Sequence, residues 1–245
     1  MKSVRLLRSL TAAAVFVSGL SIVTLGRAER AAAAPTVTKT VFSDFFGGDR
    51  GATPDPAKWA PAREAWLDGE GRLVLDDTLR TAKAVTQKSG RAMAKIQMRR
   101  TSGAWRALGV LDESGRIPAG KVEVLADDGV ADDEFHTYAI EWTPTSMVWS
   151  VDDVDVIRFT PAVSGQPFHL ALNLNSWGNR APAIAVDTVR VTIQVAVKTT
   201  AWEKFTAYQA GQYVTYKGGT YRVTERHTSL PGWQPTLVPA LFTKI

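Results

Sequence analysis

The decapeptide GKVEVLADDG, Gly120–Gly129, carries carboxylates at the end of a segment that alternates like a β-strand. Apolar residues alternate with Lys121 and Glu123 before the segment turns acidic and ends in glycine. Glu123 and Asp127 are four positions apart, so both would lie on one face of an unbroken strand. A pair of carboxyl groups is what general acid–base chemistry requires. This segment is therefore the first candidate for a catalytic site.

Other residue types that commonly do chemistry are scarce. The chain has no cysteine, which excludes disulfides and thiolate metal sites. Three histidines lack the spacing of a zinc site, so we expect no metal and no cofactor: His136, His169 and His227. Four aspartates on and after the candidate strand are expected to form a solvated loop: Asp127, Asp128, Asp132 and Asp133. A structural calcium ion there is the alternative, although the carboxylate spacing is not diagnostic.

The N-terminus has the pattern of an export signal. Basic residues precede an apolar run, Leu10–Leu25, and the small-residue segment AERAAAAP follows. This order predicts a helical secretory signal peptide over residues 1–34, cleaved between Ala31 and Ala34, and hence a secreted, extracellular protein. An uncleaved anchor is the alternative, but the run is shorter than the roughly 20 residues that span a membrane. We expect no membrane association after cleavage.

The signal segment also accounts for most of the net charge. Removing residues 1–34 takes away five of the 29 basic and one of the 24 acidic residues, which lowers the net charge from +5 to about +1. A mature chain this close to neutral has no basic footprint for nucleic acid, so no nucleic-acid partner is expected. We expect the protein to be a monomer.

Strand signals dominate residues 36–196. Short β-branched or aromatic runs such as Ala92–Met98 and Thr137–Trp142 are separated by turn clusters such as LDGEG and DESGRIPAG. Many short strands with frequent turns predict an all-β antiparallel sandwich or jelly roll. Three tryptophans fall within strand patterns and are expected in its core: Trp59, Trp142 and Trp149.

Composition changes near residue 198. Four of the five tyrosines lie in residues 201–245, together with two tryptophans and two phenylalanines. So small a segment cannot bury every ring, and some are expected to face water. Trp233 lies in the loop Gly232-Trp233-Gln234-Pro235, which would display it outward. An exposed indole offers a flat surface that matches the apolar face of a pyranose ring. Four rings at strand-like positions are expected in the core instead: Trp202, Tyr208, Tyr216 and Tyr221.

This segment also carries a continuous series of motifs: Ala201-Trp202, Tyr208-x-x-Gly211, Val214-Thr215-Tyr216-x-Gly218, Thr220-Tyr221, His227-Thr228-Ser229, Gly232-Trp233-x-Pro235 and Pro239-Ala240-Leu241. Together they resemble the type 3 chitin-binding domain, the carbohydrate-binding modules of families 5 and 12. The resemblance covers residues 201–245 and implies a small β-module that binds chitin. The sugar-contacting residues that it implies are Trp233, His227, Thr228, Pro235 and Pro239, although His227 could equally brace the loop. Phe242 replaces a tryptophan usual in the family.

A second series of motifs runs through residues 36–196: FSDFF (Phe42–Phe46), DPAKW (Asp55–Trp59), DGEGRLVL (Asp68–Leu75), GRAMAKI (Gly90–Ile96), FHTYAIEWTP (Phe135–Pro144), PFHLALNL (Pro167–Leu174) and VDTVRV (Val186–Val191). In order and spacing they resemble glycoside hydrolase family 16. The resemblance implies a concanavalin-like β-jelly roll of the kind that cuts β-linked glucans and galactans.

The family resemblance allows the segment Gly120–Gly129 to be aligned with the family's catalytic strand. The family's catalytic strand reads Gly-Glu-apolar-Asp-apolar-apolar-Glu-x-x-Gly, with its first and last glutamates as nucleophile and acid/base. A retaining glycosidase needs these carboxyl groups about 5–5.5 Å apart, which strand alternation with one bulge provides. Aligning on the two glycines places Lys121 at the nucleophile, Glu123 at the middle carboxylate and Ala126 at the acid/base. Both reacting carboxyls are lost, so no catalytic residue is expected.

The motifs that line the family's cleft are also altered. Trp-Pro-Ala-Phe-Trp becomes Trp105-Arg106-Ala107-Leu108-Gly109, which keeps only the first tryptophan. Trp177 follows the Asn-Leu run, where the family's loop helps to line the cleft. We expect Trp105 and Trp177 either to contact a glycan or to fill the core.

These features predict a secreted carbohydrate-binding protein, a pseudoenzyme in which an inactive family 16-like domain is fused to a chitin-binding module. The alternative is an active endo-β-glycanase that uses a displaced pair, Glu123 and Asp127. A third alternative, a jelly roll that binds protein or envelope material, has no positive feature in the sequence.

Overall fold

The computed structural model describes residues 34–98, 103–130, 132–174 and 183–245. The expected signal peptide, apart from its last residue, and Trp177 therefore lie outside the described residues. Within the described ranges, no helix has the length and apolar character needed to cross a membrane.

The large domain consists of short strands and a single described 3₁₀ turn, η1 (Ala104–Ala107). Its strands are β1 (Thr36–Asp44), β2 (Ala65–Leu67), β3 (Leu73–Leu75), β4 (Leu79–Arg80), β5 (Gly90–Gln97), β6 (Leu108–Leu111), β7 (Gly120–Val124), β8 (Phe135–Trp142), β9 (Met147–Val151), β10 (Val154–Pro161), β11 (His169–Leu172) and β12 (Ile184–Ala196).

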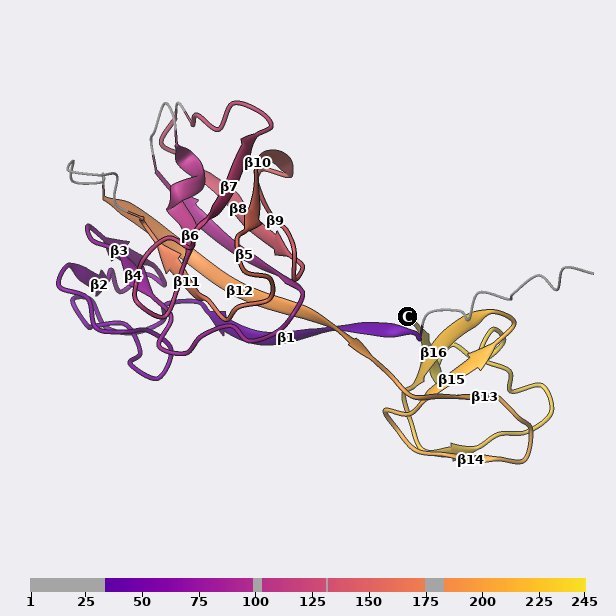
Figure 1. Ribbon diagram of the computed structural model, residues 1–245. Helices are drawn as coiled ribbons and strands as arrows, with labels where there is room; N and C mark the ends of the chain where they lie inside the picture. The colour runs from indigo at the N-terminus through magenta and orange to yellow at the C-terminus, as the bar shows by residue number, and fades with distance from the viewer. Residues whose placement is uncertain (1–33, 99–102, 131, 175–182) are drawn as a thin grey trace, which may run out of the picture. The chain divides into compact units, whose positions relative to one another are not determined.

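These strands form two antiparallel sheets, as the sequence predicts for a jelly roll (Figure 1). The larger sheet runs β2-β3-β12-β5-β8-β9-β10-β7, with β1 paired to β12, and the smaller runs β4-β11-β6. Neighbours in the large sheet are distant in sequence, since β12 pairs with β1, β3 and β5. The order of strands in space therefore differs from their order in the chain, as in a Greek-key sandwich.

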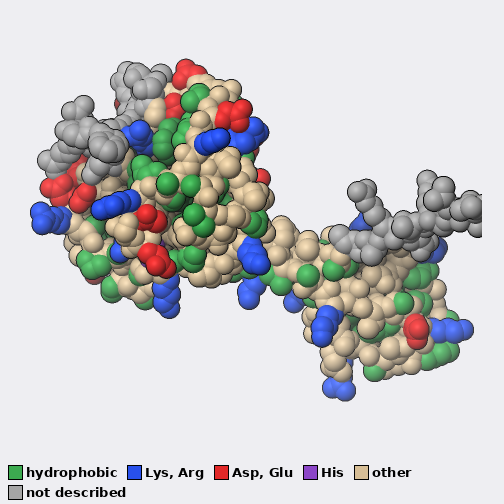
Figure 2. Space-filling view, viewed as in Figure 1, with side chains coloured by type: hydrophobic (Ala, Val, Ile, Leu, Met, Phe, Trp, Pro, Cys, Tyr) green, Lys and Arg blue, Asp and Glu red, His purple; other side chains and the backbone are tan. Residues whose placement is uncertain are grey.

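One apolar core holds this domain together. Strand β5 shows why, because Ala92, Ala94 and Ile96 are fully buried while the residues between them face outward. The three tryptophans expected in the core are buried there, which confirms that prediction. Each indole N–H also has a partner: Asp44 Oδ2 for Trp59, and the carbonyls of Gln87 and Leu108 for Trp142 and Trp149. Figure 2 shows acidic and basic side chains interspersed over the visible face of this domain.

Strand β7 is the last strand of the large sheet and pairs with β10. All five of its residues are exposed. Gly120 approaches β10 so closely that a Cβ atom there would lie 2.4 Å from both the Phe159 ring and the Thr160 carbonyl oxygen. Only glycine fits this contact without a shift of the backbone. The candidate catalytic strand is thus a sheet edge with one tightly packed end.

The small module has two sheets of its own. Its strands are β13 (Thr199–Ala201), β14 (Ala207–Tyr208), β15 (Tyr213–Tyr216), β16 (Gly219–Val223), β17 (His227–Thr228) and β18 (Phe242–Lys244). They pair as β13-β15-β16-β18 and β14-β17. A compact core contains Tyr208, Val214, Tyr221, Val223 and Phe242. Trp202 and Tyr216 pack against it, so the four aromatic residues expected at core positions lie there.

Candidate functional site

Strand β7 presents Lys121 and Glu123 on one exposed face. Glu123 lies opposite Arg158 of β10, and its carboxylate Oε2 is 2.9 Å from the Arg158 guanidinium. Both side chains are more than two-fifths exposed, so the ion pair contributes little to stability. The ion pair does place the Arg158 cation beside Glu123, the carboxylate expected at the middle position of the family's motif. Lys121 adds a second basic residue to the same face.

A β-bulge follows directly after β7. The amides of Leu125 and Ala126 both donate to the carbonyl oxygen of Val156, at 2.9 and 3.4 Å. Two residues therefore oppose one, and alternation shifts by one position. Ala126, which follows the bulge, is half-buried and packs against the apolar core of the domain.

The same bulge affects the geometry of the displaced pair, Glu123 and Asp127. Glu123 and Asp127 would share a face only in an unbroken strand, and the ladder is broken between them. Asp127 lies beyond the strand, where its Oδ1 accepts the Gly129 amide at 3.1 Å. The structure therefore does not bring these two carboxylates together by strand alternation.

Of the four aspartates expected in a solvated loop, Asp128 is half-buried and the other three are exposed: Asp127, Asp132 and Asp133. Asp128 accepts the Gly103 amide on Oδ1 at 2.9 Å and the Trp105 amide on Oδ2 at 3.4 Å, so it caps the start of η1. In the described part of the chain, no three His, Cys, Asp or Glu side chains gather as they would around a metal ion. The carboxylates of Asp127, Asp128 and Asp132 each accept a backbone amide.

Trp105 lies on the side of β7 that carries Val122. It is half-buried, and its ring packs edge-on against Trp149 with centroids 5.8 Å apart. It also lines an apolar cavity of about 100 Å³ together with Gly120 and Val122. Because Gly120 and Val122 point to one side of β7, Lys121 and Glu123 point to the other. The expected cleft tryptophan and the degenerate catalytic positions are therefore on opposite faces of the strand.

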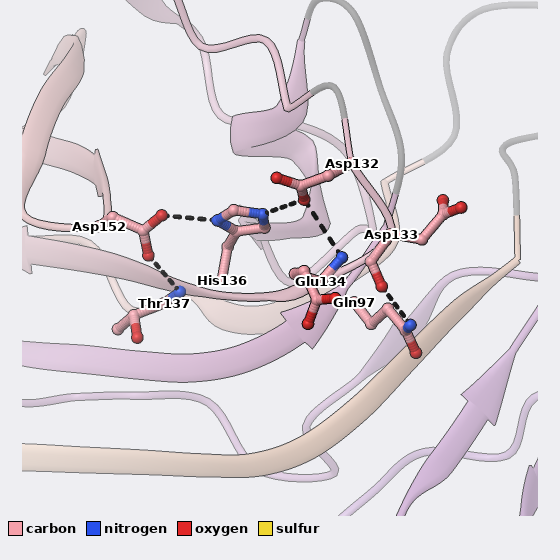
Figure 3. A network of polar contacts seen from close by, with 7 residues as sticks. All are labelled: Gln97, Asp132, Asp133, Glu134, His136, Thr137 and Asp152. Atoms are coloured by element: carbon pink, nitrogen blue, oxygen red, sulfur yellow. Dashed lines mark hydrogen bonds and ion pairs between the residues drawn. The ribbon is translucent and has the colours of Figure 1, made fainter.

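A histidine clamp ties the acidic loop to the β9–β10 turn (Figure 3). His136 Nε2 lies 2.7 Å from Asp132 Oδ1, and Nδ1 lies 2.6 Å from Asp152 Oδ2. The hydrogen bond to Asp132, then that to Asp152, raise the pKa of His136 above its ordinary value of 6.5, against the effect of burial. Sequence reasoning missed this cluster, because only sheet register brings Asp152 beside His136.

In the small module, Trp233 is exposed on a turn, as the sequence predicts, with 36% of its surface accessible. We call Leu230–Pro235 the Trp233 loop; its turn closes where the Trp233 amide donates to the Leu230 carbonyl at 3.0 Å. The Trp233 ring lies against His227, with centroids 6.2 Å apart. His227 in turn contacts the rings of Tyr208 and Phe242.

His227 is held from several sides. Its Nδ1 donates to the Glu225 carbonyl at 2.8 Å, and Nε2 is buried without a hydrogen-bond partner among the described residues. The three ring contacts make His227 a brace beneath Trp233, which favours one of the two roles left open by the sequence. Thr228 and Pro239 are exposed, whereas Pro235 is buried and can only support the loop.

The family models match both parts of the chain. The model for glycosyl hydrolases family 16 matches residues 121–193, and that for carbohydrate-binding module family 5/12 matches residues 201–243. The chain therefore contains a family 16 domain followed by a family 5/12 module. This agrees with the two resemblances found in the sequence.

Individual relatives match short stretches of the chain. Chitinase A1 of Niallia circulans is 51% identical over 57 residues, which cover 21% of this chain and 8% of the chitinase. Streptogrisin-C of Streptomyces griseus is 52% identical over 44 residues, covering 18% and 10%. A β-glucanase of Rhodothermus marinus is 38% identical over 81 residues, covering 24% and 28%. The chain thus spans less than a third of the length of each of these relatives.

Solved structures with a similar fold include family 16 glucanases. SCLam, a non-specific endo-β-1,3(4)-glucanase, is 18% identical with a TM-score of 0.48, covering 66% of this chain and 93% of its own. The laminarinase of Rhodothermus marinus is 22% identical with a TM-score of 0.45, covering 65% and 99%. An antigen of Mycobacterium tuberculosis described as a pseudo β-1,3-glucanase is 18% identical with a TM-score of 0.42, covering 62% and 98%.

Proposed function

We propose that this protein is a secreted polysaccharide-binding protein. Its C-terminal module attaches it to chitin, and its family 16 domain does not hydrolyse glycans with the family's acid pair. The observation that carries the proposal is the exposed Trp233 on a turn braced by His227. Secretion rests on the basic, apolar and small-residue order of residues 1–34.

The Trp233 loop suits an insoluble sugar polymer. A pyranose ring presents apolar C–H groups on its faces, and an indole has few rotamers to lose when it is covered. The His227 brace lowers that loss further, because the ring is already supported on its inner side. The chitinases matched by this module support chitin as the polymer.

The large domain lacks the parts that glycoside hydrolysis needs. Lys121 offers a cation where the attacking carboxylate would stand, and Ala126 has no proton to donate to the leaving group. The remaining carboxylate, Glu123, is paired with Arg158.

The binding experiment uses two exposed tryptophans of the full chain. Trp233→Ala should weaken sedimentation with insoluble chitin by at least about 30-fold, the size of a binding hot spot. Trp66→Ala is the matched control, because Trp66 is 37% exposed on β2 of the large domain. Wild-type binding by Trp233→Ala would refute the assigned site.

The hydrolysis experiment measures the release of reducing ends from β-glucans, galactans and chitin. Wild type should release no more than Glu123→Gln, because neither is expected to have a catalytic pair. Activity in wild type that Glu123→Gln abolishes would instead establish an endo-β-glycanase that depends on Glu123.

A further inference from the structure

Phe205 is an exposed aromatic residue in an unfavourable backbone conformation. Its side chain is 65% exposed, and its φ angle is +61°. Glycine, asparagine and aspartate adopt this left-handed region readily, whereas a bulky side chain there is strained. Neither burial nor local geometry accounts for a phenylalanine at this position. An exposed, strained aromatic residue that the fold maintains therefore motivates a functional hypothesis.

The strain arises from a second bulge. The amide of Phe205 donates to the Ser229 carbonyl at 2.7 Å, and the amide of Thr206 donates to the Ser229 hydroxyl at 3.1 Å. Phe205 and Thr206 therefore both oppose Ser229, at the end of the β14–β17 ribbon. Ser229 is fully buried, and its hydroxyl also donates to the Glu203 carbonyl at 2.5 Å. This network fixes the backbone that carries Phe205.

The same bulge joins Phe205 to the Trp233 loop. Ser229 immediately precedes Leu230, which is 42% exposed and accepts the Trp233 amide. One ladder step, one peptide and one turn separate the two aromatic residues, which places their Cα atoms within about 16 Å. A polymer chain lying across Trp233 is long enough to reach a second ring at this distance.

We propose that Phe205 is a second sugar-stacking platform of the chitin-binding surface. The inference rests on the proposed function, because it extends the surface centred on Trp233. The Phe205 ring contacts a further pyranose unit of the same insoluble polymer. Lys204, whose ammonium lies 5.9 Å from the ring centroid, donates hydrogen bonds to oxygens around that sugar. Two separated platforms favour an extended polymer over a short soluble oligosaccharide.

The test exploits the opposite effects expected on stability and binding. In the full chain, Phe205→Asn should raise the melting temperature, since asparagine fits the left-handed region. It should also weaken sedimentation with chitin by about fivefold, the value of one aromatic contact. Phe205→Trp keeps a ring and should bind chitin as well as wild type does.

Lys217→Asn is the matched control. Lys217 is exposed, has a φ angle of +46° and lies in the tight β15–β16 turn of the same module. It should raise the melting temperature as Phe205→Asn does, and leave chitin binding unchanged. Equal loss of binding in both variants would show that relief of strain, not loss of the ring, weakens binding, and would overturn the proposal.

Two further results would also overturn it. If Phe205→Asn binds chitin like wild type while Trp233→Ala does not, the platform is absent although the proposed function stands. If Phe205→Asn lowers the melting temperature, the ring packs against protein rather than sugar. Wild-type binding by Trp233→Ala, by contrast, would refute the Trp233 site on which the proposed function rests.

Discussion

Strand β7 and the Trp233 loop are both surface segments, but they depend on their surroundings in different ways. Every side chain of β7 is exposed, and Glu123 has its charge matched by a neighbouring arginine. Trp233 is exposed on one side and supported on the other by a half-buried histidine. In the first segment, the proposed function requires that the side chains for glycoside hydrolysis are absent. The second keeps both its side chain and its support.

The difference follows from what each task requires. Glycoside hydrolysis needs two carboxyl groups at a fixed separation, so replacing either one removes the reaction while the strand still forms. Sugar stacking needs one flat ring on a rigid support. A fold can therefore lose catalysis through two side chains and still hold a binding surface.

The largest expected effect comes from restoring both acids to β7. Lys121→Glu combined with Ala126→Glu should raise hydrolysis of β-glucans at least about 100-fold above wild type, because a positioned acid or base alone contributes that much. Release of reducing ends measures the gain. Lys121→Gln with Ala126→Gln is the control of similar size and should stay inactive. A folded double-glutamate variant without activity would contradict the register through the bulge at Leu125 and Ala126.

The next prediction distinguishes a supporting role for His227 from a sugar-contacting role for Trp233 in the small module. His227→Ala removes three ring contacts and should lower the free energy of unfolding of this module by about 2–3 kcal/mol. Trp233→Ala, which removes a more exposed ring, should cost less than about 1 kcal/mol. Thermal unfolding of the two variants measures both values. Equal destabilisation would contradict the assignment of His227 as the brace.

A smaller effect is expected at the packed end of β7. Gly120→Ala introduces a Cβ atom against Phe159 and Thr160, and should lower the stability of the large domain by about 1–3 kcal/mol. Chitin sedimentation should not change, since it depends on the small module. Gly115→Ala is the control, because nothing lies within 4 Å of a Cβ there, although its φ of +77° adds some strain. An equal loss in both variants would remove the case for close packing.

The smallest effect is a pH dependence of the histidine clamp. Because its carboxylate partners raise the pKa of His136 above 6.5, the clamp stabilises the fold below about pH 6.5 and weakens as pH rises through the folded-state pKa. Burial raises the pKa of Asp152, but hydrogen bonds from His136 and Thr137 outweigh it and lower that pKa below 3.8. The clamp therefore stabilises the fold most between about pH 3.8 and about pH 6.5, the ordinary pKa values of the two side chains.

His136→Asn should remove this dependence. The melting temperature of wild type should exceed that of the variant by more at about pH 5.5 than at about pH 8.5. A constant difference across this range would mean that the His136 charge does not contribute. Chitin binding by the variant should match wild type at both pH values.

Much of both regions could be predicted from residues close together in the sequence. Alternation placed a strand at β7, and the turn residues around Trp233 predicted its exposure. The resemblance to family 16 implied one bulge in this strand, and the structure has a bulge at Leu125 and Ala126. It did not indicate that Trp105 lies on the other face of β7, because that depends on how η1 packs against Trp149. The capping role of Asp128 was missed for the same reason.

The sequence by itself determined which chemical groups are present: strand-forming runs, an indole in a turn, and Lys121 and Ala126 where the resemblance to family 16 implies two glutamates. Only the tertiary structure decided which groups meet. Arg158 lies 35 positions from Glu123, and Asp128 lies 25 positions from Gly103. Such pairs are set by the register of strands distant in the chain, and short-range spacing carries no information about that register.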